Sequence, residues 1–172
     1  MSNTLNKIRL ASIIEESIVD GPGIRFVIFT QGCKRKCQGC HNPQTLPLNG
    51  GYLEDIQGLS NKWKNNPLLK GITISGGEPF LQADKVRIII DQAIKDHLDI
   101  LIYSGYYYEE LLKLNNQDIN YILDNIDYLI DGPFEINKKN LNLLFRGSSN
   151  QRYINIKESR KMNKIVTVEE II

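Results

Sequence analysis

Three cysteines that lie within eight residues are the first candidates for chemistry in this sequence. Cys33, Cys37 and Cys40 have the spacing C-x3-C-x2-C, and the chain contains no other cysteine. Thiolates bind zinc and iron–sulfur clusters, but three of them make an incomplete ligand set. Either a fourth protein ligand closes a zinc site, or a metal centre keeps one position open for an exogenous ligand.

The residues around the cysteines are compatible with both kinds of site. His41 directly follows the third cysteine and would complete a Cys3His zinc site. A [4Fe–4S] cluster held by three thiolates would instead leave one iron free, and short spacers suit it because the three sulfurs must reach three corners of one small cube. Lys34, Arg35 and Lys36 either offset the negative charge of such a cluster or form a solvated charged stretch. Spacing alone leaves both kinds of site open.

Gly76-Gly77-Glu78-Pro79 is the second candidate segment. In one interpretation it is a plain turn from a strand to a helix, in which glycine gives backbone freedom and proline stands near the helix start. In the other, two residues without a Cβ atom let a ligand lie against the end of the strand. Backbone groups and Glu78 would then hold an ammonium and a carboxylate group.

Length and composition favour one ordinary globular domain over residues 1–172. Hydrophobic residues make up 41% of the chain and charged residues 24%, and the net charge of +1 gives no basic surface for nucleic acid or an anionic membrane. We find no apolar run that would span a bilayer and no signal peptide in residues 1–12. Three adjacent cysteines do not suggest a disulfide framework, so we expect a protein of the reducing cytoplasm.

The elements that must position these segments alternate between strand and helix. The sequence predicts strands at 7–14 (possibly an edge strand), 24–30, 71–75, 99–104, 128–130 and 152–156. It predicts helices at 52–64, 82–97, 108–114 and 119–123. Such alternation is typical of an α/β domain with a largely parallel sheet.

Parallel strands predict where the chemistry should gather. Ligands bind beyond the carboxyl ends of such strands, so the loops 32–43, 76–79, 104–106 and 131–133 should meet on one face. A complete eight-stranded barrel needs about 250 residues. The length of this chain therefore predicts a partial, incomplete TIM-type barrel with mostly parallel strands. Its site should be open on one side.

The two motifs together resemble the radical S-adenosylmethionine superfamily. Further segments are similar to the anaerobic ribonucleoside-triphosphate reductase activating proteins, and the resemblance extends over about residues 8–155. These segments are Asp20-Gly-Pro-Gly-Ile-Arg25, Gln31-Gly-Cys33, Cys40-His-Asn-Pro43, Asp131-Gly-Pro-Phe134 and Arg146-Gly-Ser-Ser-Asn-Gln151.

The resemblance implies a set of site residues. Cys33, Cys37 and Cys40 would each ligate one iron of a [4Fe–4S] cluster, and the amino and carboxylate groups of S-adenosylmethionine would chelate the fourth. Gly39, Cys40 and His41 would line that cofactor, and Gly76, Gly77 and Glu78 would hold its methionine end. Ser104 and Asp131 are further candidates for the ribose or the methionyl ammonium group, although either could instead serve as a turn or cap residue.

The resemblance also implies an activity and partners. The reduced cluster would cleave S-adenosylmethionine to a 5′-deoxyadenosyl radical, which abstracts hydrogen from a glycine Cα. Here the cofactor carries the chemistry and the protein supplies position and protection. The substrate would be a glycine loop near the carboxyl terminus of an anaerobic ribonucleoside-triphosphate reductase, and a low-potential donor such as flavodoxin would supply the electron. A peptide substrate also suits a barrel that is open on one side.

Two other functions remain as hypotheses at this point. The first is a radical S-adenosylmethionine enzyme that acts on another glycyl-radical protein or on a small molecule. The second is a non-enzymatic Cys3His zinc-binding interaction module. The segment 146–150 would either shape the site or form a partner surface, and Tyr106 to Tyr108 would be either a docking surface or part of the core and rim.

Overall fold

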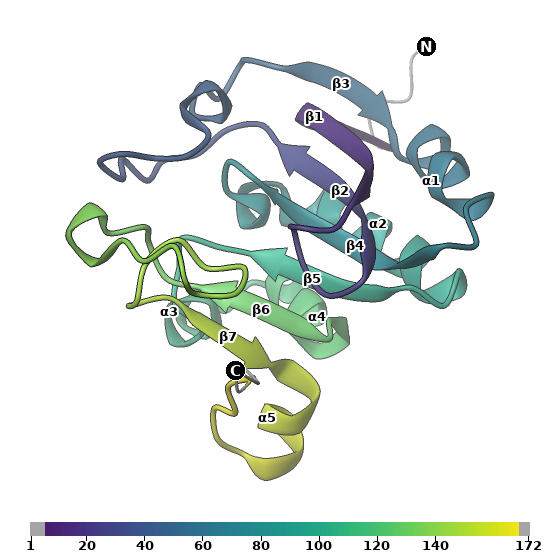
Figure 1. Ribbon diagram of the computed structural model, residues 1–172. Coiled ribbons are helices and arrows are strands. Elements are labelled where there is room, and N and C mark those ends of the chain that lie inside the picture. The colour runs from purple at the N-terminus through teal and green to yellow at the C-terminus, as the bar shows by residue number, and fades with distance from the viewer. Residues whose placement is uncertain (1–5, 169–172) are drawn as a thin grey trace.

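A single curved sheet of seven strands organises the chain, in the order β3-β1-β2-β4-β5-β6-β7 (Figure 1). The structure is a computed structural model that describes residues 6–168. Residues 1–5, part of the segment in which we expect no signal peptide, lie outside the described residues. The strands are β1 (Lys7–Ser17), β2 (Ile24–Thr30), β3 (Tyr52–Asp55), β4 (Leu69–Gly76), β5 (Asp99–Tyr103), β6 (Tyr128–Asp131) and β7 (Arg152–Asn155).

Parallel pairing joins the four central strands, and antiparallel pairing joins the outer ones. β2 pairs with β4, β4 with β5 and β5 with β6 in parallel. β1 lies antiparallel to β2 and β3, and β7 lies antiparallel to β6. The sheet has two edges, β3 and β7, and does not close. This confirms the predicted α/β fold with an incomplete barrel.

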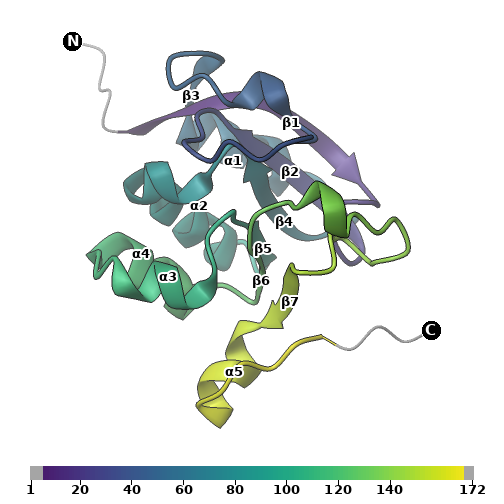
Figure 2. The same cartoon turned by 90° about the vertical axis from the view of Figure 1, so that its left-hand side faces the viewer.

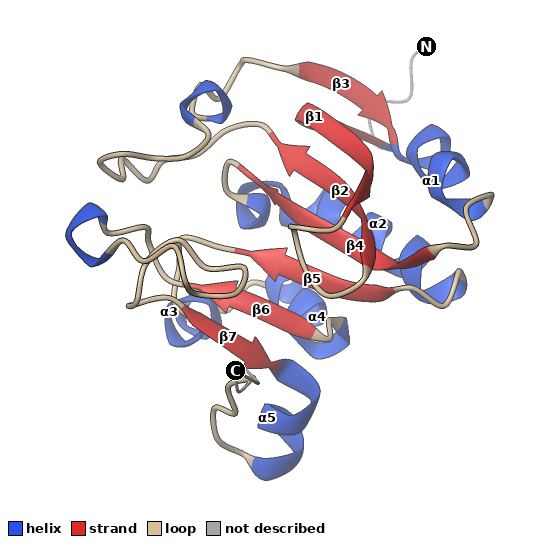
Figure 3. Ribbon diagram, viewed as in Figure 1, coloured by secondary structure: helices blue, strands red, loops and turns tan. Residues whose placement is uncertain are grey.

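The first four helices along the chain cover the outer face of this sheet and the last lies beside its β7 edge, as Figure 2 and the colouring of Figure 3 show. They are α1 (Ile56–Lys64), α2 (Ala83–Lys95), α3 (Tyr108–Lys113), α4 (Gln117–Asn125) and α5 (Ile156–Met162). The core lies between the two layers: Ile72 and Ile74 of β4 and Ile89 and Ile90 of α2 are all completely buried in it. None of the helices within residues 6–168 is long and apolar enough to cross a membrane.

Two elements differ from the prediction. The segment predicted as a helix over 52–64 begins as strand β3, which pairs with β1, and the helix starts only at Ile56, where the Asp55 side chain caps it by accepting from the Gly58 N–H at 2.8 Å. Leu53 matches the helical spacing but is 51% exposed on the strand. β1 is therefore covered by β3 and is not an edge strand, because pairing with a distant segment overrides the local pattern.

A buried arginine fills the inside of the barrel near the amino ends of its strands. Arg25 is completely buried and forms an ion pair with Asp99. It also donates hydrogen bonds to the Thr73 hydroxyl at 3.1 Å and to the Ile72 carbonyl at 2.5 Å. Gly21 packs against it with a φ of +139°, and a Cβ atom there would lie 2.8 Å from Leu101. The Asp20–Arg25 segment thus closes this end of the barrel.

Candidate functional site

The cysteine loop leaves the carboxyl end of β2 and is closed at its base by hydrogen bonds. The backbone N–H groups of Gly32 and Cys33 donate to the carbonyl oxygens of Thr45 and Leu46 at 2.7 and 3.1 Å. The buried side-chain amide of Gln31 donates to two further carbonyls of this returning segment. Residues 33–44 are therefore held as a closed loop over the strand end, on the same side as the 132–151 segment (Figure 1).

Gly76 and Gly77 pack directly against the backbone of the cysteine loop. The N–H of Gly77 donates to the Thr30 carbonyl, and the N–H of Glu78 donates to the Gly32 carbonyl, both at 2.8 Å. A Cβ atom on Gly77 would lie 2.3 Å from the Gly32 oxygen, and one on Gly76, whose φ is +100°, would lie 2.5 Å from the Thr30 nitrogen. The two glycines are thus needed for the two loops to meet.

The buried side-chain carboxyl group of Glu78 accepts hydrogen bonds from three donors. It is 1% exposed. Its Oε1 accepts from the Ser104 hydroxyl at 3.0 Å and the Phe80 N–H at 3.2 Å, and its Oε2 accepts from the Gly105 N–H at 2.8 Å. Burial raises the pKa of Glu78 to about 7, although these donors and the nearby Arg35 oppose the shift. A ligand ammonium group beside Glu78 would favour the charged form.

One cavity brings most of the expected site residues together beyond the carboxyl ends of the parallel strands. Its walls include Cys33, Cys37, Cys40, His41, Gly76, Gly77, Glu78 and Ser104. Gly39 and Asp131 are not among its lining residues. The loops after β2, β4 and β5 meet here, where open parallel sheets bind ligands.

The three thiols share this cavity and are all partly buried. Within residues 6–168, no group of three His, Cys, Asp or Glu side chains is placed to hold a single metal ion. Burial, the carboxyl group of Glu78 and the other two thiols raise the pKa of Cys33, while a hydrogen bond with the backbone of Arg35 lowers it. Three thiols around a shared cavity are a donor set that fits a cluster with one open iron better than a closed tetrahedral zinc site.

The turn after the third cysteine rests on the segment that follows β6. The His41 ring lies 4.7 Å from the Phe134 ring, centroid to centroid. A Cβ atom on Gly147 would lie 3.1 Å from His41, and one on Gly39 would lie 3.0 Å from Ile136. Gly39, with a φ of +74°, therefore contacts the 134–136 turn, whereas His41 also lines the cavity.

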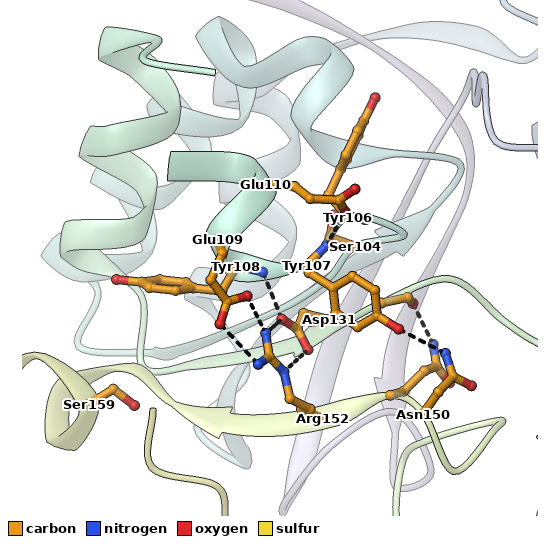
Figure 4. Close-up of polar contacts among 12 residues, drawn as sticks. Ser104, Tyr106, Tyr107, Tyr108, Glu109, Glu110, Asp131, Asn150, Arg152 and Ser159 are labelled. Atoms are coloured by element: carbon orange, nitrogen blue, oxygen red, sulfur yellow. Dashed lines mark hydrogen bonds and ion pairs between the residues drawn. The ribbon is translucent and has the colours of Figure 1, made fainter. Parts of the chain in front are cut away.

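Asp131 lies away from the cavity, in a polar network between β6, β7 and α3 (Figure 4). Its carboxylate is completely buried and accepts from the Tyr108 N–H at 2.7 Å. Arg152 donates to it from Nε at 3.0 Å and from Nη2 at 2.5 Å, and also pairs with Glu109. In this structure the Asp131 carboxylate therefore makes the contacts expected of a cap residue.

The segment 146–151 folds back onto the Asp131-Gly-Pro-Phe134 turn. The Gln151 side chain accepts from the N–H groups of Gly147 and Ser148 at 2.9 and 3.2 Å and donates to the Gly132 carbonyl at 3.1 Å. The Asn150 side-chain amide donates to the Pro133 carbonyl at 2.8 Å. These hydrogen bonds hold the 146–151 segment against the turn at the side of the cavity. Of the three consecutive tyrosines, Tyr107 contacts Asn150 through its hydroxyl at 3.4 Å and belongs to this rim.

A second, outer cavity of about 550 Å³ adjoins the first and shares His41 and Phe134 with it. Apolar side chains from opposite sides of the barrel, including Phe29 and Phe145, form much of its wall. Tyr103, whose hydroxyl donates to the Phe145 carbonyl at 2.8 Å, lines both cavities. The sequence indicates no individual role for Tyr103 or Gln31, because each acts through partners distant along the chain.

Comparisons with known proteins agree with this geometry. Residues 19–154 match a family described as a 4Fe-4S single cluster domain. The anaerobic ribonucleoside-triphosphate reductase-activating protein of Salmonella typhimurium is 34% identical over 143 residues, which cover 78% of this chain and 90% of that protein. The protein of the same name from Enterobacteria phage T4 is 33% identical over 143 residues, covering 78% of this chain and 85% of its own length.

Two further proteins share part of the chain. The pyruvate formate-lyase-activating enzyme of Clostridium pasteurianum is 39% identical over 114 residues, which cover 61% of this chain and 48% of that enzyme. Among solved structures, QueE from Escherichia coli superposes with a TM-score of 0.46 at 15% identity. That superposition covers 60% of this chain and 57% of QueE.

Proposed function

The chain belongs to the 4Fe-4S single cluster domain family and, within it, to the anaerobic ribonucleoside-triphosphate reductase-activating proteins, and on this premise we propose that it installs a glycyl radical on such a reductase. It is a radical S-adenosylmethionine enzyme. The observation that carries the proposal is the shared cavity: the only three cysteines line it together with Glu78 and Ser104, and they supply three thiolates rather than four.

The chain's own residues bind and orient the cofactors. Cys33, Cys37 and Cys40 would hold a [4Fe–4S] cluster, and Glu78, which accepts a hydrogen bond from Ser104, would accept the ammonium group of the cofactor. When bound, the cluster and S-adenosylmethionine supply a radical that removes a hydrogen atom from a glycine Cα. Gly39 and His41 support the cofactor side of the cluster loop through the 134–147 segment.

We place the substrate in the outer cavity. It is open, adjoins the cofactor cavity and has both apolar and polar side chains in its walls, which suits a glycine-bearing peptide loop near the carboxyl terminus of the reductase. A low-potential donor such as flavodoxin would supply the electron, and a reducing cytoplasm would keep the three thiols available. In this proposal the whole chain acts as one domain.

Anaerobic reconstitution followed by electron paramagnetic resonance tests the proposal. We expect brown protein with about four irons per chain. With a reductant, S-adenosylmethionine and the reductase of the same source, it should give a glycyl-radical doublet. Colourless protein that binds one zinc and never takes up a cluster would remove the enzyme assignment.

A second candidate substrate is a glycyl-radical enzyme of the pyruvate formate-lyase type. The 39% identity to an activating enzyme of that class supports this candidate. The same experiment separates the two substrates when both target proteins are offered in parallel. A doublet on the lyase with none on the reductase would transfer the assignment to this second class.

A further inference from the structure

Arg35, in the first spacer of the cysteine motif, is anchored to another part of the chain. Its guanidinium lies over the ring of Tyr106, 4.3 Å from the ring centroid. It also donates to Glu110 from Nη2 at 3.0 Å. The neighbouring Lys34 and Lys36 are exposed, whereas the Arg35 side chain is 27% exposed. The charged stretch of the spacer is therefore not uniformly solvated.

Both partners of Arg35 are themselves fixed, Tyr106 in the turn between β5 and α3 and Glu110 in the first turn of α3. The Tyr106 N–H donates to the Ser104 hydroxyl at 3.0 Å, and the Glu110 carboxylate accepts from the Tyr107 N–H at 2.7 Å (Figure 4). The stem of Arg35 passes this turn closely, since a Cβ atom on Gly105 would lie 3.3 Å from its Cγ. Arg35 thus contacts a rigid feature of the fold.

The spacer itself has little other support. Among the backbone hydrogen bonds within residues 6–168, none joins Lys34, Arg35 or Lys36 to another segment; the loop is closed at its base and carries one internal bond, from the Cys40 N–H to the Cys37 carbonyl at 3.3 Å. Arg35 also lines the cavity that holds the thiols. Its side chain therefore joins the Cys33–Cys37 spacer to the β5–α3 region, whereas Gly39 and His41 contact the 134–147 segment further along the loop.

We propose that Arg35 is a positioning residue that clamps the Cys33–Cys37 spacer onto the β5–α3 turn, so that these two thiols are arranged before a cluster binds. The purpose that we give to the clamp, to arrange the thiols for a cluster, rests on the proposed function. The clamp itself is a property of the chain without its cofactors. A planar guanidinium can stack on an aromatic ring and pair with a carboxylate at the same time.

Thiol labelling of the cluster-free, reduced full-length chain tests the clamp. Iodoacetamide labelling, resolved for each cysteine by mass spectrometry, should be about tenfold faster at Cys33 and Cys37 in Arg35→Gln, because one cation–π contact and one exposed ion pair are lost. Cys40 serves as an internal reference. Loss of positive charge alone raises thiol pKa values and slows labelling, so acceleration reports opening of the loop.

Matched variants separate the clamp from simple charge. Lys34→Gln and Lys36→Gln remove the same charge from exposed neighbours and should not accelerate labelling. Tyr106→Leu should accelerate it as Arg35→Gln does, and the double variant should be no faster than either single one. Equal rates in Arg35→Gln and the two lysine variants would overturn the proposal.

The result is independent of cluster loading. A chain that shows the labelling effect but never takes up about four irons would keep the clamp and lose the proposed function. A chain that takes up the cluster, with Arg35→Gln labelled at the wild-type rate and releasing iron to a chelator at the wild-type rate, would keep the function and lose the clamp.

Discussion

The backbone N–H of Glu78 donates to the carbonyl oxygen of Gly32 at 2.8 Å. This bond joins the segment after β4 to the start of the cysteine loop after β2, two parts of the site that are far apart in the sequence. It places the buried carboxyl group of Glu78 and the thiol of Cys33 on one cavity. The position of this carboxyl group, which we propose binds the cofactor, therefore depends on contact between two backbones.

Gly77→Ala should disrupt this junction, because the added Cβ atom would lie 2.3 Å from the Gly32 oxygen. We expect a loss of about 3 kcal/mol in the free energy of unfolding, since neither backbone can move without breaking hydrogen bonds. Urea unfolding of the cluster-free chain measures it.

Gly58→Ala is the control for that change. Gly58 lies within α1, and the nearest atom to an added Cβ would be 3.6 Å away, an ordinary contact. This substitution should stabilise the chain by about 0.5–1 kcal/mol, because alanine favours the helix. Equal effects at the two glycines would contradict the role we assign to Gly77.

Stability should fall as pH rises, because of Glu78. Burial raises its pKa from 4.5 to about 7, so across that window the folded chain binds the proton more tightly than the unfolded chain does. The contribution of Glu78 to the free energy of unfolding is then greatest below pH 4.5, declines by roughly 3 kcal/mol up to about pH 7, and stays level above it.

Glu78→Gln isolates this effect, since its side chain does not ionise. The difference in unfolding free energy between the variant and the wild type should change across that pH window and stay constant above it. A difference that is the same at all pH values would show that Glu78 titrates normally in the folded chain.

Asp99→Asn should be far more damaging than a similar change at the surface. It removes the charge that balances the completely buried Arg25, and we expect a loss of about 3 kcal/mol. Asp124→Asn breaks an ion pair with Arg160 in which both side chains are more than 40% exposed, and should cost less than about 0.5 kcal/mol. Denaturant titration of both variants makes the comparison. Equal losses would mean that burial of Arg25 adds nothing to the pair.

Cys37→Ala should abolish cluster retention, because two remaining thiolates cannot hold a four-iron cube. Iron per chain after anaerobic reconstitution and gel filtration measures this. Gln38→Ala changes the exposed next residue of the same loop and should keep about four irons. Full iron content in Cys37→Ala would overturn the ligand assignment.

The sequence predicts the strands and their loops well, because a run such as Ile24–Thr30 carries its own pattern and each loop follows from its strand. It does not predict contacts that depend on distant partners. At Gly76 and Gly77 the sequence indicates a turn or room for a ligand, but it does not indicate that these glycines also pack against the backbone of Thr30 and Gly32.

Two other differences have the same cause. Tyr52–Asp55 has helical spacing but becomes a strand because β1 offers it a partner. Arg35 is one of three adjacent cations in the sequence, and only the fold distinguishes it, by bringing Tyr106 and Glu110 within reach. Local pattern therefore suffices for the elements, while the roles of individual site residues depend on tertiary contacts.

Asp131 allows a test between a cofactor ligand and a structural anchor. Its buried carboxylate is bound by Arg152 and by the Tyr108 N–H, so we expect Asp131→Asn to lower the free energy of unfolding by about 2–3 kcal/mol. Affinity for S-adenosylmethionine in the reconstituted protein, measured by isothermal titration, should change less than about twofold, a difference well below 1 kcal/mol.

Arg152→Gln is the matched variant, because it breaks the same ion pair from the side of β7, and Arg152 lines neither of the two cavities of the site. If Asp131 is an anchor, the two variants should lose similar stability and both keep their affinity for the cofactor. If Asp131 is a ligand, its substitution alone should weaken cofactor binding while Arg152→Gln leaves it unchanged. The second pattern would return Asp131 to the cofactor site, and it would require the carboxylate to leave Arg152 when the cofactor binds.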